Sequence, residues 1–389
     1  MKRTYEETHP WITFHVDLSR IDYRVWMLIG EAQSKCEHIN GTPLHPETAE
    51  RLHRVYLSKG AFATTSIEGN TLSEEQVLER VEGRLKLPDS QEYLGVEVDN
   101  IVEACNLIAR DVQQGRPLAL TPERIRHFNR LVLQDLKLDD DTAPGECRQH
   151  SVVVGNYRGA PAEDCEYLLE QLCSWLNGDD FAAGDPILVF PFAVLKAVLA
   201  HLYIAWIHPF GDGNGRTARL IELQLLMQSG LVSMPASHLL SNHYNQTRSR
   251  YYQELDRASK TGDVAEFVRY ALEGFVDGLR SQLEVVREQH LLVTWKNYVH
   301  ELFRGKDTPA RRRQKHVVLD MPMRSLGRAE IRRVSDRVRD EYAGKTEKTL
   351  TRDLNALSRL GLIVREGGGI SANYDLIHAF LPPRVSTEA

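Results

Sequence analysis

Cysteine is scarce in this sequence, and the patterns by which cysteines hold small folds together are absent. The chain contains five cysteines, an odd number with no Cys-x-x-Cys pair: Cys36, Cys105, Cys147, Cys165 and Cys173. This excludes a disulfide framework or a structural zinc site as the organising principle of the fold. A reducing compartment is the simplest interpretation, and we expect a cytoplasmic protein.

Long apolar runs are equally rare. Residues 1–14 carry charges but no apolar stretch of the kind that secretory signals contain. Residues 187–207 are about as long as a membrane span, but Pro191, Lys196 and His201 interrupt them. We therefore expect a helix buried on all sides in a globular core, and no contact with a membrane.

The sequence also lacks internal repeats and low-complexity tracts. Its 42% hydrophobic and 26% charged residues are typical of globular proteins and exclude disordered, collagen-like and coiled-coil classes. A length of 389 residues favours two or three domains. The net charge is −6, yet residues 304–365 hold 17 Lys and Arg against 8 Asp and Glu, a local charge of +9 that leaves −15 for the rest. This asymmetry indicates separate domains with different partners.

Most of the chain is predicted to be helical, because apolar residues recur at spacings of three and four. The predicted helices span residues 21–39, 46–64, 73–82, 94–113, 122–135, 162–177, 186–207, 217–229, 248–260 and 264–295. Strand signal is rare before the C-terminal region. Its clearest case is 151–154, which runs into Gly155 and Asn156 and predicts a short hairpin or flap.

The basic C-terminal region has the pattern of a small separate module. Residues 311–315 are expected to form a linker or an exposed edge. A helix over 328–341, a second helix over 349–360 and a hairpin with a glycine tip outline a winged helix-turn-helix. Residues 346–359 would be its recognition helix. Such a module binds either DNA or protein, and the acidic Glu347 and Asp353 argue against DNA.

The segment from His208 to Arg219, HPFGDGNGRTAR, gathers residues suited to phosphate chemistry. Its glycines and the start of the helix predicted to follow can turn several backbone N–H groups into one concavity, a nest for anions. Two arginines three residues apart can neutralise phosphates, and an aspartate offers the oxygen ligand that Mg²⁺ prefers. His208, with a pKa expected near neutrality, would be the general base.

These twelve residues resemble the signature of Fic-domain proteins, H-x-F-x-[DE]-G-N-G-R-x-x-R, at every specified position. The resemblance extends over about residues 1–290. The segment 145–161 is similar to the family's target-binding hairpin, and Arg248-x-x-Tyr251-Tyr252 with Gly262-Asp263 is similar to its adenine-side helix. The resemblance implies a mainly α fold, which is a Fic-type helical bundle with a short hairpin flap, followed by the winged helix.

The resemblance also implies an activity, the transfer of AMP from ATP to a Tyr, Ser or Thr hydroxyl of a protein, with release of pyrophosphate. His208 would be the base and Asp212 would hold Mg²⁺. The other residues that it assigns to the nucleotide are Glu68, Val154, Gly155, Asn156, Tyr157, Gly213, Asn214, Gly215, Arg216, Thr217, Ala218, Arg219 and Tyr251. Kinase-type members carry lysine at the position of Gly215, so the glycine favours AMP transfer.

A second segment, residues 64–70, resembles the inhibitory motif [ST]-x-x-x-E-[GN] of one class of this family. Thr64 and Glu68 share one helix face, and Gly69 can end the helix. The resemblance implies that Glu68 pairs with Arg219 and occupies the guanidinium that the γ-phosphate of ATP needs.

These observations predict three parts: residues 1–110 with the inhibitory motif, a Fic core over 111–290, and a linker helix with the winged helix over 291–389. The target would be a protein with a hydroxyl side chain, including this chain itself, and a homodimer is expected. Two other functions stay open: a DNA-binding regulator whose Fic domain senses nucleotide, and an enzyme that removes AMP with Glu68 positioning a water.

Overall fold

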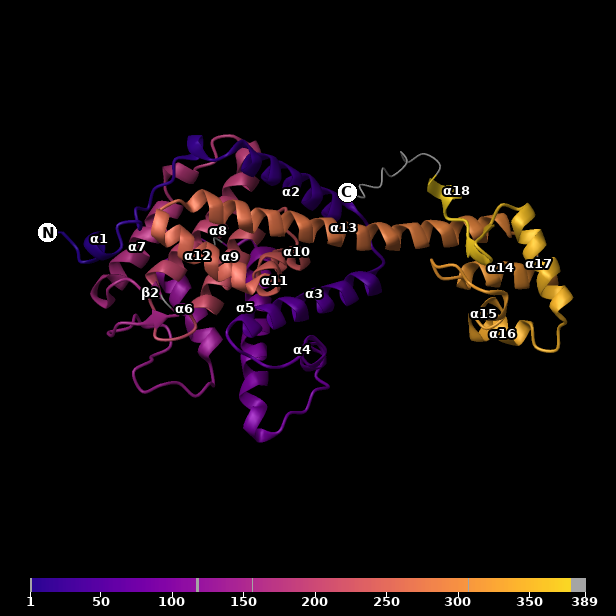
Figure 1. Cartoon of the computed structure of the whole chain (residues 1–389), viewed down its shortest axis with the longest axis horizontal. Helices are drawn as coiled ribbons and strands as arrows, with labels where there is room; N and C mark the ends of the chain where they lie inside the picture. Colours follow the sequence, from indigo (N-terminus) through magenta and orange to yellow (C-terminus); the bar gives the residue numbers. More distant parts are fainter. Residues whose placement is uncertain (1, 117–118, 156, 307, 379–389) are drawn as a thin grey trace. The chain divides into compact units, whose positions relative to one another are not determined.

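The computed structural model describes residues 2–116, 119–155, 157–306 and 308–378, and helices dominate it (Figure 1). The strands of the described residues form two small antiparallel sheets of two strands each. This architecture confirms the predicted mainly α fold class. The chain divides into two compact units, residues 1–284 and 285–389, which are described separately. The first two predicted parts, 1–110 and 111–290, fall in the first unit except for residues 285–290.

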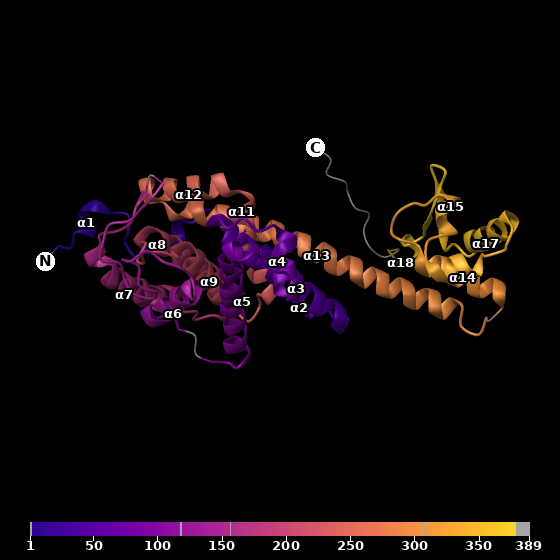
Figure 2. The same cartoon turned by 90° about the horizontal axis from the view of Figure 1, so that it is seen from below.

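The first unit is a set of helices around one hydrophobic core. Helix α8 lies in the middle, where it packs against α9 and also contacts α2, α7 and α12 (Figures 1 and 2). The helices of this unit are α1 (Tyr5–Thr8), α2 (Tyr23–Gly41), α3 (Pro46–Ile67), α4 (Glu74–Val81), α5 (Glu92–Gln113), α6 (Pro122–Leu133), α7 (Cys165–Leu176), α8 (Val189–Ile207), α9 (Asn214–Met227), α10 (Met234–Ser237), α11 (Leu239–Gln246), α12 (Arg248–Thr261) and the first part of α13 (Val264–Leu302).

Helix α8 is the apolar segment singled out in the sequence. Together with the turn before it, Pro186–Ile207 is long and apolar enough to cross a membrane by length and composition. Within the first unit, however, most of its side chains are buried, including Trp206, Tyr203 and the polar His201. The predicted burial of this helix is confirmed. Its C-terminal end places His208 at the entrance of the loop that follows.

The helix after that loop begins earlier than the sequence pattern predicted. Helix α9 starts at Asn214, not at Thr217. The Asn214 side chain accepts a hydrogen bond from the Phe210 N–H (2.9 Å) and donates one to the Phe210 carbonyl (2.8 Å). Gly213 precedes the helix with a φ of 76°, a left-handed conformation that favours glycine. The side-chain bonds and this turn fix the helix start inside the glycine-rich segment.

The hairpin predicted between the helices is present. Strands β1 (Val153–Val154) and β2 (Tyr157–Arg158) pair antiparallel, with Val153 opposite Arg158 and Val154 opposite Tyr157. Asn156, at its tip, lies outside the described residues.

The second unit has a core of its own and a helical N-terminal half. It contains the end of α13, α14 (Pro309–Asp320), α15 (Arg328–Ile331), α16 (Asp336–Glu341), α17 (Glu347–Arg359), the hairpin of β3 (Ile363–Glu366) and β4 (Gly369–Ala372), and α18 (Asp375–His378). Leu326 pairs with Ile370 and so extends the hairpin by a bridge. The winged-helix assignment stays a prediction.

Two expectations for this unit are wrong. Residues 328–341 form two helices, because Ser335 accepts a hydrogen bond from the Val338 N–H and starts α16 afresh. Residues 311–315 are part of helix α14 and not a linker or edge. Thr308 caps this helix, Pro309 occupies its first turn, and Gln314 is buried.

Candidate active site

A cavity of about 550 Å³ opens in the first unit where five segments meet. The end of α3, the β1–β2 hairpin, the end of α8, the start of α9 and the middle of α12 all line it. Among the lining residues are Glu68, His208, Gly215, Arg219 and Tyr251. The fold thus brings residues that are far apart in the sequence onto one concave surface.

His208 lies where α8 ends, in a left-handed conformation with a φ of 50°. Arg148 holds this turn in place, because its Nε donates to the His208 carbonyl at 2.7 Å and its backbone N–H donates to the Pro209 carbonyl at 2.9 Å. The same guanidinium donates to the carbonyls of His150 and Ala160, on either side of the hairpin. Arg148 therefore fastens the hairpin to the loop, a role that the sequence pattern did not indicate.

The imidazole of His208 is neutral at physiological pH. Burial disfavours its charged form and the nearby Arg148 repels a second positive charge, so that the pKa of His208 falls to about 4. The expectation of a pKa near neutrality is wrong. A neutral imidazole can accept a proton at once, which is the state that a general base requires.

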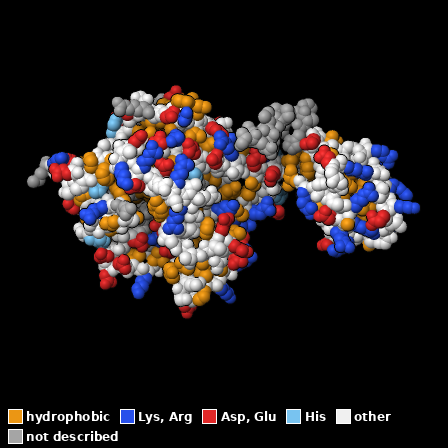
Figure 3. All heavy atoms as spheres, viewed as in Figure 1, with side chains coloured by type: hydrophobic (Ala, Val, Ile, Leu, Met, Phe, Trp, Pro, Cys, Tyr) orange, Lys and Arg blue, Asp and Glu red, His pale blue; other side chains and the backbone are white. Residues whose placement is uncertain are grey.

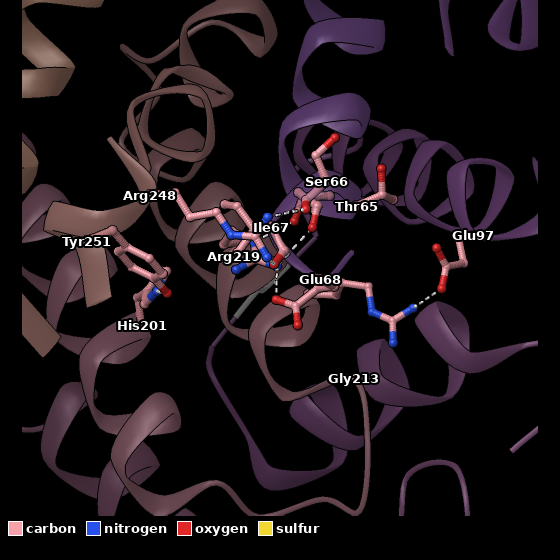
Figure 4. A network of polar contacts seen from close by, with 12 residues as sticks. Thr65, Ser66, Ile67, Glu68, Glu97, His201, Gly213, Arg219, Arg248 and Tyr251 are labelled. Atoms are coloured by element: carbon pink, nitrogen blue, oxygen red, sulfur yellow. Dashed lines mark hydrogen bonds and ion pairs between the residues drawn. The ribbon is translucent and has the colours of Figure 1, made fainter. Parts of the chain in front are cut away.

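Glu68 and Arg219 form the closest ion pair at the cavity wall (Figure 4). Glu68 caps the end of α3, and Gly69 follows with a φ of 103°, so Gly69 ends the helix as predicted. The Nη2 of Arg219 donates to Glu68 Oε1 at 2.5 Å and to the Thr64 carbonyl at 3.0 Å, and its Nε donates to Thr64 Oγ1 at 2.5 Å. Three acceptors from the segment 64–70 thus converge on one guanidinium.

The charges of this pair hold each other in the ionised state. Burial would raise the pKa of Glu68, but the charge and hydrogen bond of Arg219 outweigh it and lower that pKa. Burial would likewise lower the pKa of Arg219, and Glu68 outweighs it and raises that pKa. The guanidinium is 2% exposed while the Glu68 side chain is 32% exposed. The carboxylate is therefore the member of the pair that water and ligands can reach.

Gly215 leaves the space that the Glu68 carboxylate occupies. A Cβ atom at this position would lie 2.2 Å from Glu68 Oε1 and 3.1 Å from Arg219 Nη1. A side chain here would have to displace the carboxylate from the guanidinium. Glycine at the second position of α9 thus leaves room for the ion pair, and for any ligand that approaches the helix start.

Arg248 of α12 holds the same segment from the other side. Its guanidinium donates to the Ser66 carbonyl at 3.1 Å and to the Ile67 carbonyl at 2.5 Å, and so satisfies carbonyls at the end of α3 (Figure 4). The Tyr252 hydroxyl also donates to Ile67, at 3.4 Å. The sequence resemblance drew attention to Arg248 without indicating this contact.

Arg216 points away from Arg219 and binds two carboxylates. Its Nη1 donates to Glu97 of α5 at 3.3 Å, and its Nη2 donates to Asp212 Oδ1 at 3.1 Å. Glu97 also accepts from the Asn70 side chain at 2.8 Å. The Asp212 side chain is 52% exposed, so one carboxylate of this group remains open to solvent. Nothing in the sequence pattern pointed to Glu97.

The loop is held from behind by Asn129, which the sequence analysis did not single out, and by predicted residues of the loop itself. Asn129 donates to the Asp212 carbonyl at 2.9 Å and lies within 3.4 Å of Thr217 Oγ1. Thr217 and Ala218 are fully buried, and the Asn214 side chain is hydrogen-bonded to the backbone of Phe210. These residues hold the loop in shape. The Thr217 N–H already donates to the Gly213 carbonyl at 2.9 Å, so the donors that the start of α9 offers to an anion are the N–H groups of Asn214, Gly215 and Arg216.

The hairpin and α12 bound the rest of the cavity. Val154, Gly155 and Tyr157 line it, and the Tyr157 hydroxyl donates to the Trp206 carbonyl at 2.8 Å. Behind Tyr251 lies a buried polar chain that sequence reasoning missed: His201 bonds to the Tyr251 hydroxyl (2.8 Å) and to Glu222 (3.2 Å). His201 had attracted notice only as an interruption of the apolar helix.

A metal site built from protein ligands alone is not found among the described residues, since no cluster of three or more His, Cys, Asp or Glu side chains occurs there. Asp212 nevertheless suits a hard divalent cation that takes its remaining ligands from phosphates and water. It supplies an oxygen ligand with an exposed face beside the start of α9.

Comparisons with known proteins match part of this chain to a known family. Residues 119–226 match the family model Fic/DOC. The chain is 29% identical over 263 residues to Protein adenylyltransferase fic-1 of Caenorhabditis briggsae, covering 65% of this chain and 46% of the relative. It is 31% identical over 216 residues to Protein adenylyltransferase Fic of Drosophila ananassae, covering 54% and 38%. The chain therefore spans less than half the length of these curated relatives.

Solved structures share the fold. A Fic-1 fragment from C. elegans superposes with a TM-score of 0.56 at 25% identity, over 70% of this chain and 74% of the fragment. A Fic family protein from Desulfovibrio desulfuricans superposes with a TM-score of 0.54 at 18% identity, over 92% of this chain and 97% of that protein, and supports the fold alone.

The first prediction concerns the ionisation of His208. Because its pKa lies at about 4, its ring signals in an NMR titration should not change between pH 8 and 6 and should shift only as the pH approaches 4. The unfolded chain binds this proton near pH 6.5, so the histidine lowers stability as the pH falls from there towards 4. A titration midpoint between 6 and 7 would contradict the assigned environment.

The second prediction concerns the space at Gly215. In the wild-type chain, Gly215→Ala should lower the unfolding free energy by about 1.5–3 kcal/mol, because the new Cβ displaces Glu68 from Arg219. In a Glu68→Gly background the same change should be neutral or stabilise by up to about 1 kcal/mol, because alanine favours the helix. Denaturant titrations of the four proteins give both values. An equal cost in the two backgrounds would show that the two residues do not interact.

Proposed function

Because residues 119–226 match the Fic/DOC family model, we propose that this chain is a protein adenylyltransferase that transfers AMP from ATP to a Tyr, Ser or Thr hydroxyl of a target protein, including itself. The observation that carries this proposal is the convergence of His208, the start of α9 and Arg219 on one cavity. These parts supply a base, anion-binding N–H groups and a cation, which phosphoryl chemistry needs in one place. The names of the curated relatives support the same reaction class.

The reaction starts at His208. Its neutral imidazole takes the proton of the target hydroxyl, whose oxygen forms a bond to the α-phosphorus of ATP. The bond from this phosphorus to the oxygen that bridges to the β-phosphate breaks, and pyrophosphate leaves with the electron pair. Because the pKa of His208 is about 4, the imidazolium readily passes its proton to water. The left-handed turn held by Arg148 keeps the imidazole at the cavity wall during these steps.

The phosphates would lie against the start of α9. Gly215 lines the cavity at the start of this helix, where the first N–H groups have no partner within the helix and the helix dipole favours negative charge. Gly213 and Asn214 would shape the turn beneath the phosphates. Arg219 would meet the γ-phosphate once Glu68 is absent. Val154, Gly155 and Tyr157 would flank the nucleotide from the hairpin, and Tyr251 would flank it from α12.

We also propose a Mg²⁺ requirement, with Asp212 as the protein ligand. The bound ion would offset the negative charge of the phosphates. Asp212 is held by Arg216 through one oxygen, Oδ1, which also accepts from the Gly213 N–H, and is otherwise exposed. Its second oxygen is therefore available to a cation.

In the state described, the segment 64–70 inhibits the enzyme that we propose. ATP needs a cation for its γ-phosphate, and the cation at the cavity wall, Arg219, already has three acceptors. The Glu68 carboxylate also brings a negative charge to the place where the phosphate would lie. Both effects disfavour the productive pose of ATP.

The remaining predicted partners stay proposals. A homodimer is one of them. A DNA contact would belong to the second unit, and no step of AMP transfer depends on it. A pure nucleotide sensor would leave the neutral, firmly held His208 without a task, which is why we favour catalysis.

Replacing the base tests the catalytic assignment. His208→Ala should lower the incorporation of α-labelled AMP into protein by about 10²–10⁴-fold, because no other described residue of the loop can take the proton at this position. His38→Ala, which changes an exposed histidine of α2, is the matched control and should retain full incorporation. Full labelling by His208→Ala would contradict the role of the imidazole.

Replacing Asp212 tests the metal ligand. In Asp212→Ala, the Mg²⁺ concentration that supports half-maximal labelling should rise roughly tenfold to a hundredfold, since a carboxylate ligand is lost. Asp139→Ala, in an exposed loop, removes the same charge elsewhere and should leave this concentration unchanged. An Mg²⁺ dependence equal to that of the wild type would exclude Asp212 as the ligand.

Replacing Glu68 tests the inhibition, and the sign of the effect decides it. Glu68→Gly should raise AMP incorporation at subsaturating ATP about tenfold to a hundredfold. The substitution removes a charge-assisted contact of about 1.5–3 kcal/mol that competes with ATP for Arg219. Glu82→Gly is a close control, because Glu82 also caps a helix, α4, and also precedes a glycine. Unchanged or reduced incorporation by a folded Glu68→Gly protein would mean that Glu68 is only a helix end.

A further inference from the structure

Helix α17 of the second unit has two opposite faces of different chemistry. Leu350, Leu354 and Leu357 are buried in the core of this unit. On the side opposite them, four exposed polar residues recur at spacings of three and four: Lys348, Arg352, Asn355 and Arg359. We call these four residues the α17 stripe. It runs along the whole exposed side of the helix.

The cations of the α17 stripe have no acidic partner. Within the described part of the chain, Lys348, Arg352 and Arg359 form no ion pair, whereas six other arginines of this unit do. The Asn355 amide oxygen accepts a hydrogen bond from Arg365 of β3 at 2.7 Å, which brings a further cation beside the stripe. Lys345, just before the helix, is also exposed and unpaired among the described residues. Unpaired cations in a row match a polyanion.

The two acidic residues that argued against DNA in the sequence do not lie on this stripe. Asp353 is 3% exposed and faces inward, where it accepts hydrogen bonds from Arg313 (3.0 Å), Gln314 (3.1 Å) and Tyr342 (2.9 Å). Glu347 forms a surface ion pair with Arg332 at 2.8 Å, on a flank of the helix and not on the stripe. The charge of Asp353 is therefore compensated inside the unit, where the side chain links α17 to α14 and to Tyr342 at the end of α16. The objection to DNA binding loses its basis.

We infer that the α17 stripe, with Arg365 on the adjoining hairpin, is a binding surface for duplex DNA. A single exposed helix can enter the major groove, and the side chains of the stripe are those that reach phosphates and base edges: Lys and Arg for both, and Asn for adenine. The hairpin β3–β4 turns at Gly367 and Gly368, and its exposed Arg365 lies beside the helix. Figure 3 shows Lys and Arg side chains along the edge of this unit where α17 lies in Figure 1.

A protein partner is the competing occupant of such a helix, and the observations favour DNA over it. The exposed side of α17 carries no large apolar side chain, whereas protein interfaces take their binding energy from buried aromatic and aliphatic anchors. Duplex DNA carries a regular array of negative charge, which a straight row of cations matches.

The test is fluorescence anisotropy of the full-length protein with a labelled 30-base-pair DNA duplex of mixed sequence, at several salt concentrations. Wild-type protein should bind, with an affinity that falls steeply as salt rises. The double variant Lys348→Ala/Arg352→Ala should bind about tenfold to a hundredfold more weakly near 0.1 M salt, with a salt slope lower by roughly two. Arg304→Ala/Lys306→Ala, which removes two exposed cations from neither α17 nor the hairpin, should bind as the wild type does.

Three results would overturn the inference: no binding of the duplex at low salt, equal loss in the two double variants, or binding of duplex RNA in preference to DNA. Arg352→Lys keeps the charge and should restore most of the binding that Arg352→Ala loses, which separates a phosphate contact from a folding defect. Because the assay contains no nucleotide, its outcome is independent of AMP transfer.

Discussion

The ion pair between Glu68 and Arg219 is the contact around which the wall of the cavity is built. Arg219 is almost fully buried, and a buried guanidinium without a partner is costly, so the site needs an anion at this position whether or not ATP is present. The protein supplies that anion itself from the end of α3. Around this pair the structure is arranged to make room and to hold it, through the missing side chain of Gly215 and the carbonyl contacts of Arg248.

In this arrangement the proposed catalytic groups are in place, but Glu68 occupies the position that a phosphate would take beside Arg219. The neutral His208, the start of α9 and Asp212 are in place without any ligand. The proposed catalytic groups therefore need no rearrangement before the reaction. What opposes the reaction is a single carboxylate that a phosphate can replace in kind, since both are anions and both bind the fork of an arginine.

The sequence predicted most of the features whose geometry depends on residues a few positions apart. The helical periods, the hairpin at 151–154 and the end of α3 at Gly69 depend on neighbours in the chain, and the sequence predicted them. It missed some local helix starts, such as those set by Asn214 for α9 and by Ser335 for α16, and it failed where distant residues decide. The pKa of His208 depends on burial and on Arg148, 60 residues away, and the partner of Arg216 is Glu97 on another helix. Asp353 could not be placed inside the second unit until its partners on α14 and α16 were known.

The central claim is that Glu68 competes with the γ-phosphate for Arg219, and nucleotide binding tests it without any turnover. Calorimetry would give the Kd of ATP and of ADP, which lacks the γ-phosphate, for the wild-type protein and for Glu68→Gly. The account predicts that the substitution lowers the Kd of ATP at least about tenfold more than the Kd of ADP. Equal changes for the two nucleotides, or none, would show that the carboxylate and the γ-phosphate do not share this site.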